Sequence, residues 1–155
     1  MANLTGTQKV FQGDTSTIDT TQAYNLGTIA FDASGNEYIY LKGVASNAAG
    51  KWVTYDENFA TTLLAANAVG SVAIAMSATD STSKFGWFQR KGVNTIASTD
   101  TVAADKALYI DNTAGRADDD SVSGDLIVGA ASMTASSSNV ATVQLNYPFV
   151  TDVLG

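Results

Sequence analysis

Carboxylates form the densest group of potentially reactive side chains in this sequence. Asp118, Asp119 and Asp120 are consecutive, and Asp125 follows shortly after them. Oxygen ligands at such spacing can coordinate calcium, but the spacing matches no EF-hand loop. Turns favour Asp, and only Arg116 is close enough in sequence to offset the repulsion, so a solvated β-turn explains the group better. We therefore assign no metal and no cofactor.

Other carboxylates could be paired as in a glycosidase, among them Asp32, Glu37, Asp56 and Glu57. All four lie at or beside predicted turns, where solvated side chains are the simpler interpretation. The sequence contains no His and no Cys, which removes the usual general base and every thiolate nucleophile. It also contains no glycine-rich phosphate loop and no nucleophile elbow. We expect the protein not to be an enzyme.

Four aromatic residues, Trp52, Tyr55, Trp87 and Phe88, are candidates for binding. Large amphipathic rings are enriched at interfaces, so these side chains could stack on a sugar or contact another protein. The alternative is that at least half of them fill the core. The sequence leaves both interpretations open.

The run from Lys84 to Gly92 concentrates aromatic and basic residues in one predicted strand. Alternation along a strand places Phe85 and Trp87 on one face and Phe88 and Arg90 on the other. Both faces carry an aromatic ring, so we expect both to be covered. In a small β-domain this pattern favours a neighbouring subunit as the cover of one face.

Composition and charge narrow the class of protein. The chain has 155 residues, of which 45% are hydrophobic and 15% charged, which suits one compact folded domain. Its net charge of -7 repels a polyanion, so we expect no nucleic-acid partner. No segment approaches the roughly 20 apolar residues that span a bilayer, so we expect no membrane partner.

Short runs rich in Ile, Val, Thr, Tyr and Phe, closed by Gly, Asn, Asp or Ser, predict an all-β fold from residue 26 onward. A helix competes weakly at Leu63 to Ala68, where we allow a single turn at most. The only proline, Pro148, directly follows the predicted strand Val140 to Leu145. Since proline cannot donate to a ladder, we expect that strand to end there or to run along an edge.

The predicted strands of the second half repeat the order of the first. Residues 104–111 align with 49–56, residues 124–130 with 70–76, and residues 140–145 with 84–89, at offsets of 55, 54 and 56. Short strands of similar composition can also match by chance. A real repeat would place two similar β-units about a pseudo-two-fold axis. We expect a compact β-sandwich or a small β-barrel.

Residues 1–25 differ from the rest, because they are rich in Thr, Gln, Ser and Asp with few apolar side chains. We interpret them as an extended N-terminal arm, poorly packed on its own domain, and residues 26–155 as the single β-domain. A simply loose terminus is the alternative to an arm that orders on a partner.

Several stretches of the chain resemble small decoration, or cement, proteins of tailed bacteriophage heads. The stretches are LGTIAF at 26–31, GVASNAAGKWV at 43–53, AMSATDSTSKFGW at 75–87 and ATVQLNYPF at 141–149. The resemblance covers about Leu26 to Asp152 and involves no functional motif. It implies a β-rich structural protein, synthesised in the bacterial cytoplasm, that binds the outside of an icosahedral capsid and stabilises the expanded shell, often as a homotrimer.

The resemblance implies two partners, the major capsid protein and other copies of this chain, and no catalytic residue. We expect subunit or capsid contacts at these positions: Phe11, Trp52, Tyr55, Phe85, Trp87, Phe88, Arg90 and Lys91. The alternative function is a carbohydrate-binding or adhesin-like module that uses Trp52, Tyr55 or Trp87 as a stacking surface.

Overall fold

The structure, a computed structural model, describes residues 12–152. Within that range the chain forms ten β-strands and no helix, so the all-β prediction is confirmed. The strands are β1 (Ile29–Phe31), β2 (Glu37–Lys42), β3 (Trp52–Tyr55), β4 (Thr61–Leu63), β5 (Gly70–Ala75), β6 (Phe85–Ser98), β7 (Ala107–Ile110), β8 (Ala117–Asp118), β9 (Leu126–Ser132) and β10 (Val140–Val150).

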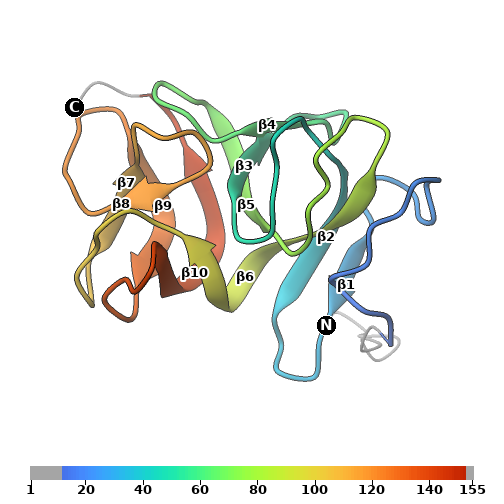
Figure 1. The fold of residues 1–155 in the computed structure, drawn as a ribbon, viewed down its shortest axis with the longest axis horizontal. Coiled ribbons are helices and arrows are strands. Elements are labelled where there is room, and N and C mark those ends of the chain that lie inside the picture. Colours follow the sequence, from blue (N-terminus) through green and yellow to red (C-terminus); the bar gives the residue numbers. More distant parts are fainter. Residues whose placement is uncertain (1–11, 153–155) are drawn as a thin grey trace, which may run out of the picture.

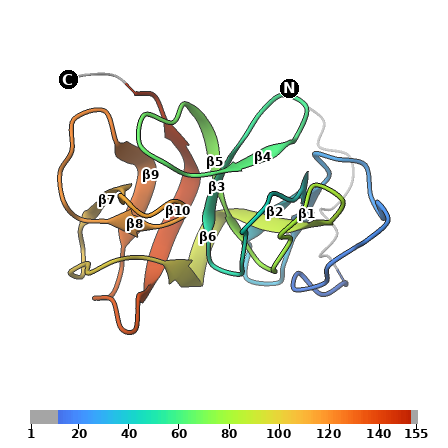
Figure 2. The same ribbon diagram turned by 45° about the horizontal axis from the view of Figure 1, so that its top comes forward.

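All ten strands belong to one antiparallel hydrogen-bonded sheet. The main order is β1-β2-β6-β5-β10-β9-β7-β8, and β3 pairs with both β4 and β5. Figure 1 shows β7 to β10 gathered on one side of the molecule and β1 to β5 toward the other, with β6 running between them. The same division is visible in the turned view of Figure 2. The sheet therefore has a first half and a second half, joined through β6, β5 and β10.

Single-residue bridges curl each half of the sheet. Lys42 of β2 forms a parallel bridge with Ala60, just before β4, and Thr99 after β6 forms one with Ala117 of β8. The curled first half encloses an apolar cluster that includes Leu41, Val53, Ala75 and Phe88. The larger cluster of the second half includes Leu108, Ile127, Val143 and Leu145, together with Trp52 and Ile74 from the first half.

The strand pairings of the two halves correspond. In the first half β3 pairs with β4 and β5, and in the second β7 pairs with β8 and β9. Tyr55 lies opposite Thr61, and Ile110 lies opposite Ala117. The predicted internal repeat stays a prediction, because similar pairing does not by itself establish a repeated sequence.

The strand β6 is longer than the predicted run, because it serves both halves. Its beginning pairs with β2 and β5, and its end pairs with β10. The change of partner occurs near Gly92, which has a φ of 98°. There the buried Gln89 donates through Nε2 to the carbonyls of Lys91 and Val93, at 3.1 Å each, and Asn94 donates to its Oε1 at 2.9 Å. These bonds give the buried side-chain amides of Gln89 and Asn94 partners where β6 changes strand neighbours.

Pro148 neither ends β10 nor lies at an edge, so that prediction is wrong. The strand continues to Val150 and pairs with β5, β6 and β9. The proline is tolerated because it falls where the register with β9 shifts, between Leu145 and Phe149, and a bulge needs no donor there.

Some described residues of the predicted arm contact the domain, although most of residues 12–25 are exposed, and the arm stays a prediction. Asp19 and Phe85 exchange two backbone hydrogen bonds of 2.9 Å, and the Tyr40 hydroxyl donates to Asp19 Oδ2 at 2.6 Å. Burial, followed by this carboxylate, raises the pKa of Tyr40 to about 12. The Tyr24 ring lies 5.3 Å from the ring of Trp87. Tyr24 of the chain's own N-terminal segment therefore contacts the Trp87 face of β6, and the neighbouring subunit expected as the cover of one face stays a prediction.

Candidate functional site

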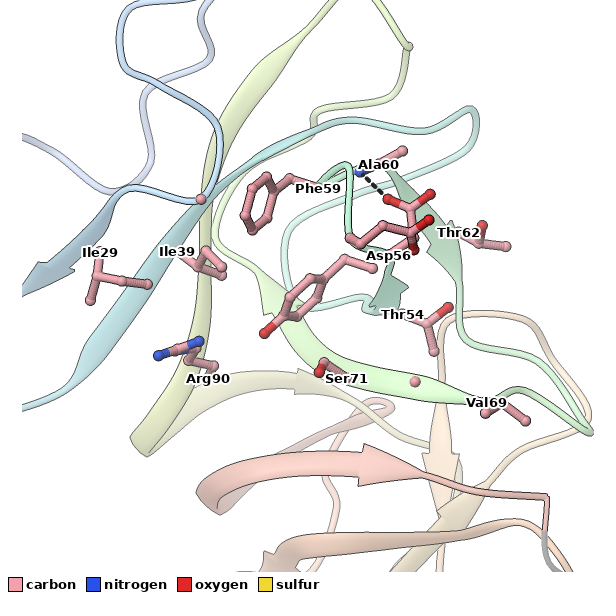
Figure 3. Close-up of a pocket in the computed structure, with 14 residues that line it drawn as sticks. Ile29, Ile39, Thr54, Asp56, Phe59, Ala60, Thr62, Val69, Ser71 and Arg90 are labelled. Carbon is pink, nitrogen blue, oxygen red and sulfur yellow. Dashed lines mark hydrogen bonds between the residues drawn. The ribbon is translucent and has the colours of Figure 1, made fainter.

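A groove of about 830 Å³ opens at the mouth of the curled first half. Ile29, Ile39 and Phe59 lie in the upper left part of Figure 3, and Arg90 and Ser71 lie below them. Asp56 and Glu57 form part of the rim, in the turn between β3 and β4. Asp56 is fixed by that turn, because its Oδ1 accepts hydrogen bonds of 2.9 Å from the amides of Asn58 and Ala60. The groove thus combines apolar side chains, such as Ile29, Ile39 and Phe59, with polar ones and an acidic rim.

Arg90 is held firmly at the end of the groove. Its Nε donates to Oε1 of the buried Glu37 at 2.5 Å, and the same pair forms an ion pair. Burial alone would lower the pKa of Arg90, but hydrogen bonding with Tyr55 and Glu37 outweighs it and raises the pKa. The positive charge of Arg90 is therefore permanent and already matched by Glu37.

Tyr147 of β10 extends this cluster beyond the groove. Its hydroxyl donates to the second oxygen of Glu37 at 2.8 Å. The Arg90 guanidinium lies 5.1 Å and the Lys91 ammonium 5.5 Å from the centre of its ring, which are cation–π distances. Tyr147 has a φ of 48°, an uncommon conformation for a bulky residue. The cluster holds a partly exposed ring where the two halves meet.

A cross-strand row leads from the groove to the outside of the second half. Tyr55 lies opposite Ser71, Ser71 opposite Phe149, and Phe149 opposite Val128, across β3, β5, β10 and β9. Directly opposite residues of an antiparallel sheet share a face, so these four side chains lie on one face. We call them the cross-strand row.

This face is buried in one half and exposed in the other. In β5 it carries Ala73 and Ala75, which belong to the core of the first half. In β9 the core residue Ile127 lies on the opposite face, and Leu126 and Val128 remain 40% and 37% exposed. Phe149 of β10 is 43% exposed. Beyond Ser71, which ends the groove, this face therefore carries three exposed apolar side chains, Leu126, Val128 and Phe149, which we call the apolar ledge.

The predicted contact residues separate into buried and accessible ones. Trp52, Trp87 and Phe88 have at most 2% of their surface exposed, so the contact prediction does not hold for these three. They fill cores within the chain, and the Trp52 indole donates to the Ser98 carbonyl at 3.0 Å. The proposed sugar platform loses both of its Trp side chains for the same reason.

The other predicted contact residues are partly exposed or lie outside the described range. Tyr55 and Arg90 meet at the groove, and Lys91 lies over Tyr147. Phe85 lies apart from them, stacked on Tyr40 with ring centres 6.4 Å apart. Phe11 falls outside the described residues. The accessible members of the set therefore do not form a single surface.

The acidic group is less solvated than expected. Asp118 and Asp125 are buried, and Asp125 Oδ1 accepts the amide of Asn67 at 3.1 Å. Burial, and then the nearby carboxyls of Asp111 and Asp120, raise the pKa of Asp118 to about 6. The interpretation as a solvated turn is therefore wrong for Asp118 and Asp125. Among residues 12–152, no group of three or more carboxylates is arranged to hold a metal ion.

Comparisons with protein-family models, with curated proteins and with solved structures found no match for this chain. In residues 12–152, no helix is long and apolar enough to cross a membrane. The interpretation of the site therefore depends on its own geometry.

The sequence interpretation missed several residues of this site, namely Glu37 as an ion-pair partner, Tyr147, Phe149 and Val128. Tyr147 and Phe149 flank the proline at which we ended the last strand, so they were not assigned to a sheet face. Val128 was assigned to a strand, but no local signal indicates that its side chain faces solvent while Ile127 faces the core. A strand continued through Pro148 would have placed Tyr147 and Phe149 on one face.

Proposed function

We propose that this protein is a structural virion protein that binds the outer surface of an icosahedral phage capsid and stabilises the expanded shell, as a homotrimer. The partners are the major capsid protein and other copies of the chain. The location in this proposal is the exterior of the virion. Four stretches of sequence that resemble phage head decoration proteins motivate it.

The observation that carries the proposal is the uncovered apolar ledge. Four of the eleven large apolar side chains that are exposed in residues 12–152 lie on β9 and β10 in or beside the cross-strand row, namely Leu126, Val128, Tyr147 and Phe149. Exposed apolar residues that cluster on one region, and are rimmed by polar ones, mark protein interaction sites. A protein that stabilises a shell by binding across the boundaries between its subunits needs such a surface and needs no reactive group.

The physical chemistry of a shell suits this surface. A single ledge of modest size gives a modest affinity, since the ordering of partners opposes association. A trimer presents three copies at once to a symmetric lattice, so the later contacts form at a high effective concentration. Each bound trimer then links several shell subunits and raises the cost of separating them.

The test is to add the purified protein to expanded empty shells that lack it. We expect saturable binding at micromolar protein and an upward shift in the temperature at which the shells break, measured by light scattering and electron microscopy. Sedimentation of the free protein should give the mass of a trimer. Absence of binding at these concentrations would exclude the capsid role, whatever the oligomeric state.

A further inference from the structure

We propose that the groove and the cross-strand row form one docking surface for an extended segment of the shell protein. The segment would place a basic side chain at the groove rim, beside Asp56 and Glu57, and apolar side chains over Phe149 and Val128. This inference rests on the proposed function, because the shell supplies the segment. It identifies which side of the molecule contacts the shell protein and which kinds of side chain it contacts there.

The row sets the length of the segment. Its four residues lie on four adjacent strands, β3, β5, β10 and β9. Neighbouring strands are about 4.8 Å apart, so the row spans roughly 14 Å, and an extended chain advances about 3.3 Å per residue. A segment of about five residues therefore reaches from the acidic rim to the ledge.

The charges select a basic occupant from another protein. Asp56 and Glu57 are exposed, and neither is paired with a cation in the part of the chain that the structure describes. Arg90 does not neutralise them, since Glu37 already matches its charge. A second copy of the chain also carries a net charge of -7, so self-association through this rim would bring like charges together. A Lys or Arg of the shell protein at the rim would remove that cost.

The side chains on this surface are already ordered, which favours binding. Glu37 and Tyr55 fix Arg90, and Tyr147 is fixed by its hydrogen bond to Glu37 and by the cations over its ring. Groups held in place before association lose little conformational entropy on binding. Tyr and Arg are also the residue types that contribute most at protein interfaces. Phe149 and Val128 add apolar area beside them.

The experiment measures binding to expanded empty shells for a matched set of variants. Val128→Ser changes the ledge, and Val140→Ser makes the same change on an equally exposed Val (37% and 39%) outside the row. Phe149→Ser and Glu57→Lys test the ledge aromatic and the acidic rim. Each variant is first checked for an unchanged melting temperature and circular dichroism spectrum, which surface substitutions should preserve.

We expect Phe149→Ser and Glu57→Lys each to weaken shell binding about tenfold, the effect of losing roughly 1.4 kcal/mol. Val128→Ser should weaken it several-fold, while Val140→Ser stays within twofold of the unchanged protein. Added salt should weaken shell binding by the unchanged protein, and it should weaken binding by the Glu57→Lys variant much less.

Three results would overturn this inference. If the unchanged protein binds shells and all four variants bind equally well, the docking surface is wrong but the capsid role stands. If Val128→Ser or Phe149→Ser dissociates the free oligomer in sedimentation, the ledge is a subunit interface. If the unchanged protein binds no shells, both the capsid role and the docking surface are excluded.

Discussion

In the first half of the sheet β3 carries Trp52 and Tyr55, and in the second half β7 carries Ala107 and Ile110 at the positions that the predicted repeat aligns with them. Trp52 is fully buried and extends into the core of the second half, while Ala107 is exposed. Tyr55 lines the groove, while Ile110 is buried among aliphatic side chains. The same strand pairing thus supports an open aromatic mouth in one half and a closed aliphatic core in the other.

This difference shows how one strand order can serve two purposes. Strand pairing depends on backbone hydrogen bonds and alternation, which many side chains satisfy. Whether a face of the sheet forms a closed core or an open groove depends on the size of the side chains on it. The larger rings of the first half leave a lined groove, whereas the smaller side chains of the second half pack closely and leave Leu126, Val128 and Phe149 outside. Four substitutions test this comparison, in decreasing order of expected effect.

Trp52→Ala should have the largest effect, because this ring connects the two halves. Removing it leaves a cavity in the shared core and an unpaired Ser98 carbonyl. Loss of a buried Trp costs about 3–5 kcal/mol. Ala107→Ser, at the corresponding exposed position, should change stability by less than about 0.5 kcal/mol. Urea unfolding of both variants makes the measurement, and equal effects would show that Trp52 does not join the halves.

Gln89→Leu should cost about 3 kcal/mol, since two carbonyls lose the hydrogen bond from Gln89 and the Asn94 amide keeps only its weak bond to Met76 Sδ. The predicted repeat aligns this position with Leu145 in the second half, where an apolar side chain is buried. Leu145→Met should cost less than about 1.5 kcal/mol, because it conserves volume and adds no polar group. A Gln89→Leu protein as stable as the unchanged one would mean that the bend in β6 does not need this network.

Gly92→Ala should cost about 2 kcal/mol, because it combines a positive φ with a collision. A Cβ on Gly92 would meet the Asn36 amide oxygen, which accepts the Val93 amide. Gly35 also has a positive φ, of 80°, but a Cβ there meets nothing within 4 Å. Gly35→Ala should therefore cost about half as much. Thermal unfolding of both variants measures their losses of stability. The difference between the two losses is the cost of the collision, and equal losses would argue against a collision.

Asp118→Asn should have the smallest effect, and its sign depends on pH. The pKa of Asp118 is raised to about 6 in the folded protein, so the folded state holds the proton more tightly than the unfolded state does. The Asp118 carboxyl therefore contributes most to the stability of the folded state below about pH 4, and this contribution falls as the pH rises to about 6. Thr62, which lies opposite Thr54 of β3 as Asp118 lies opposite Tyr109 of β7, is exposed and does not titrate.

The measurement for Asp118 is the free energy of unfolding at several values between pH 4 and 7. The difference between Asp118→Asn and the unchanged protein should shift toward greater relative stability of the variant as the pH rises. Glu57→Gln is the control, because Glu57 is an exposed carboxylate in the other half of the sheet. A difference that does not vary with pH would mean that Asp118 titrates normally.

The sequence alone determined the class of the fold, because alternation, β-branched residues and turn residues act locally. The prediction of strands near 29–31, 52–55 and 107–110 needed no tertiary contact. The absence of His and Cys likewise limited the chemistry available to the chain.

Only the tertiary structure decided which faces are covered and which remain open. Trp87 is covered by Tyr24, Glu37 is paired with Arg90, and Phe149 lies opposite both Ser71 and Val128. The two members of each pair are far apart in sequence, so no local pattern could match them. The side chains in a strand alternate between two faces by geometry, but whether a face meets a core, an N-terminal segment or solvent depends on how the sheet curls. That curl places the groove beside the ledge.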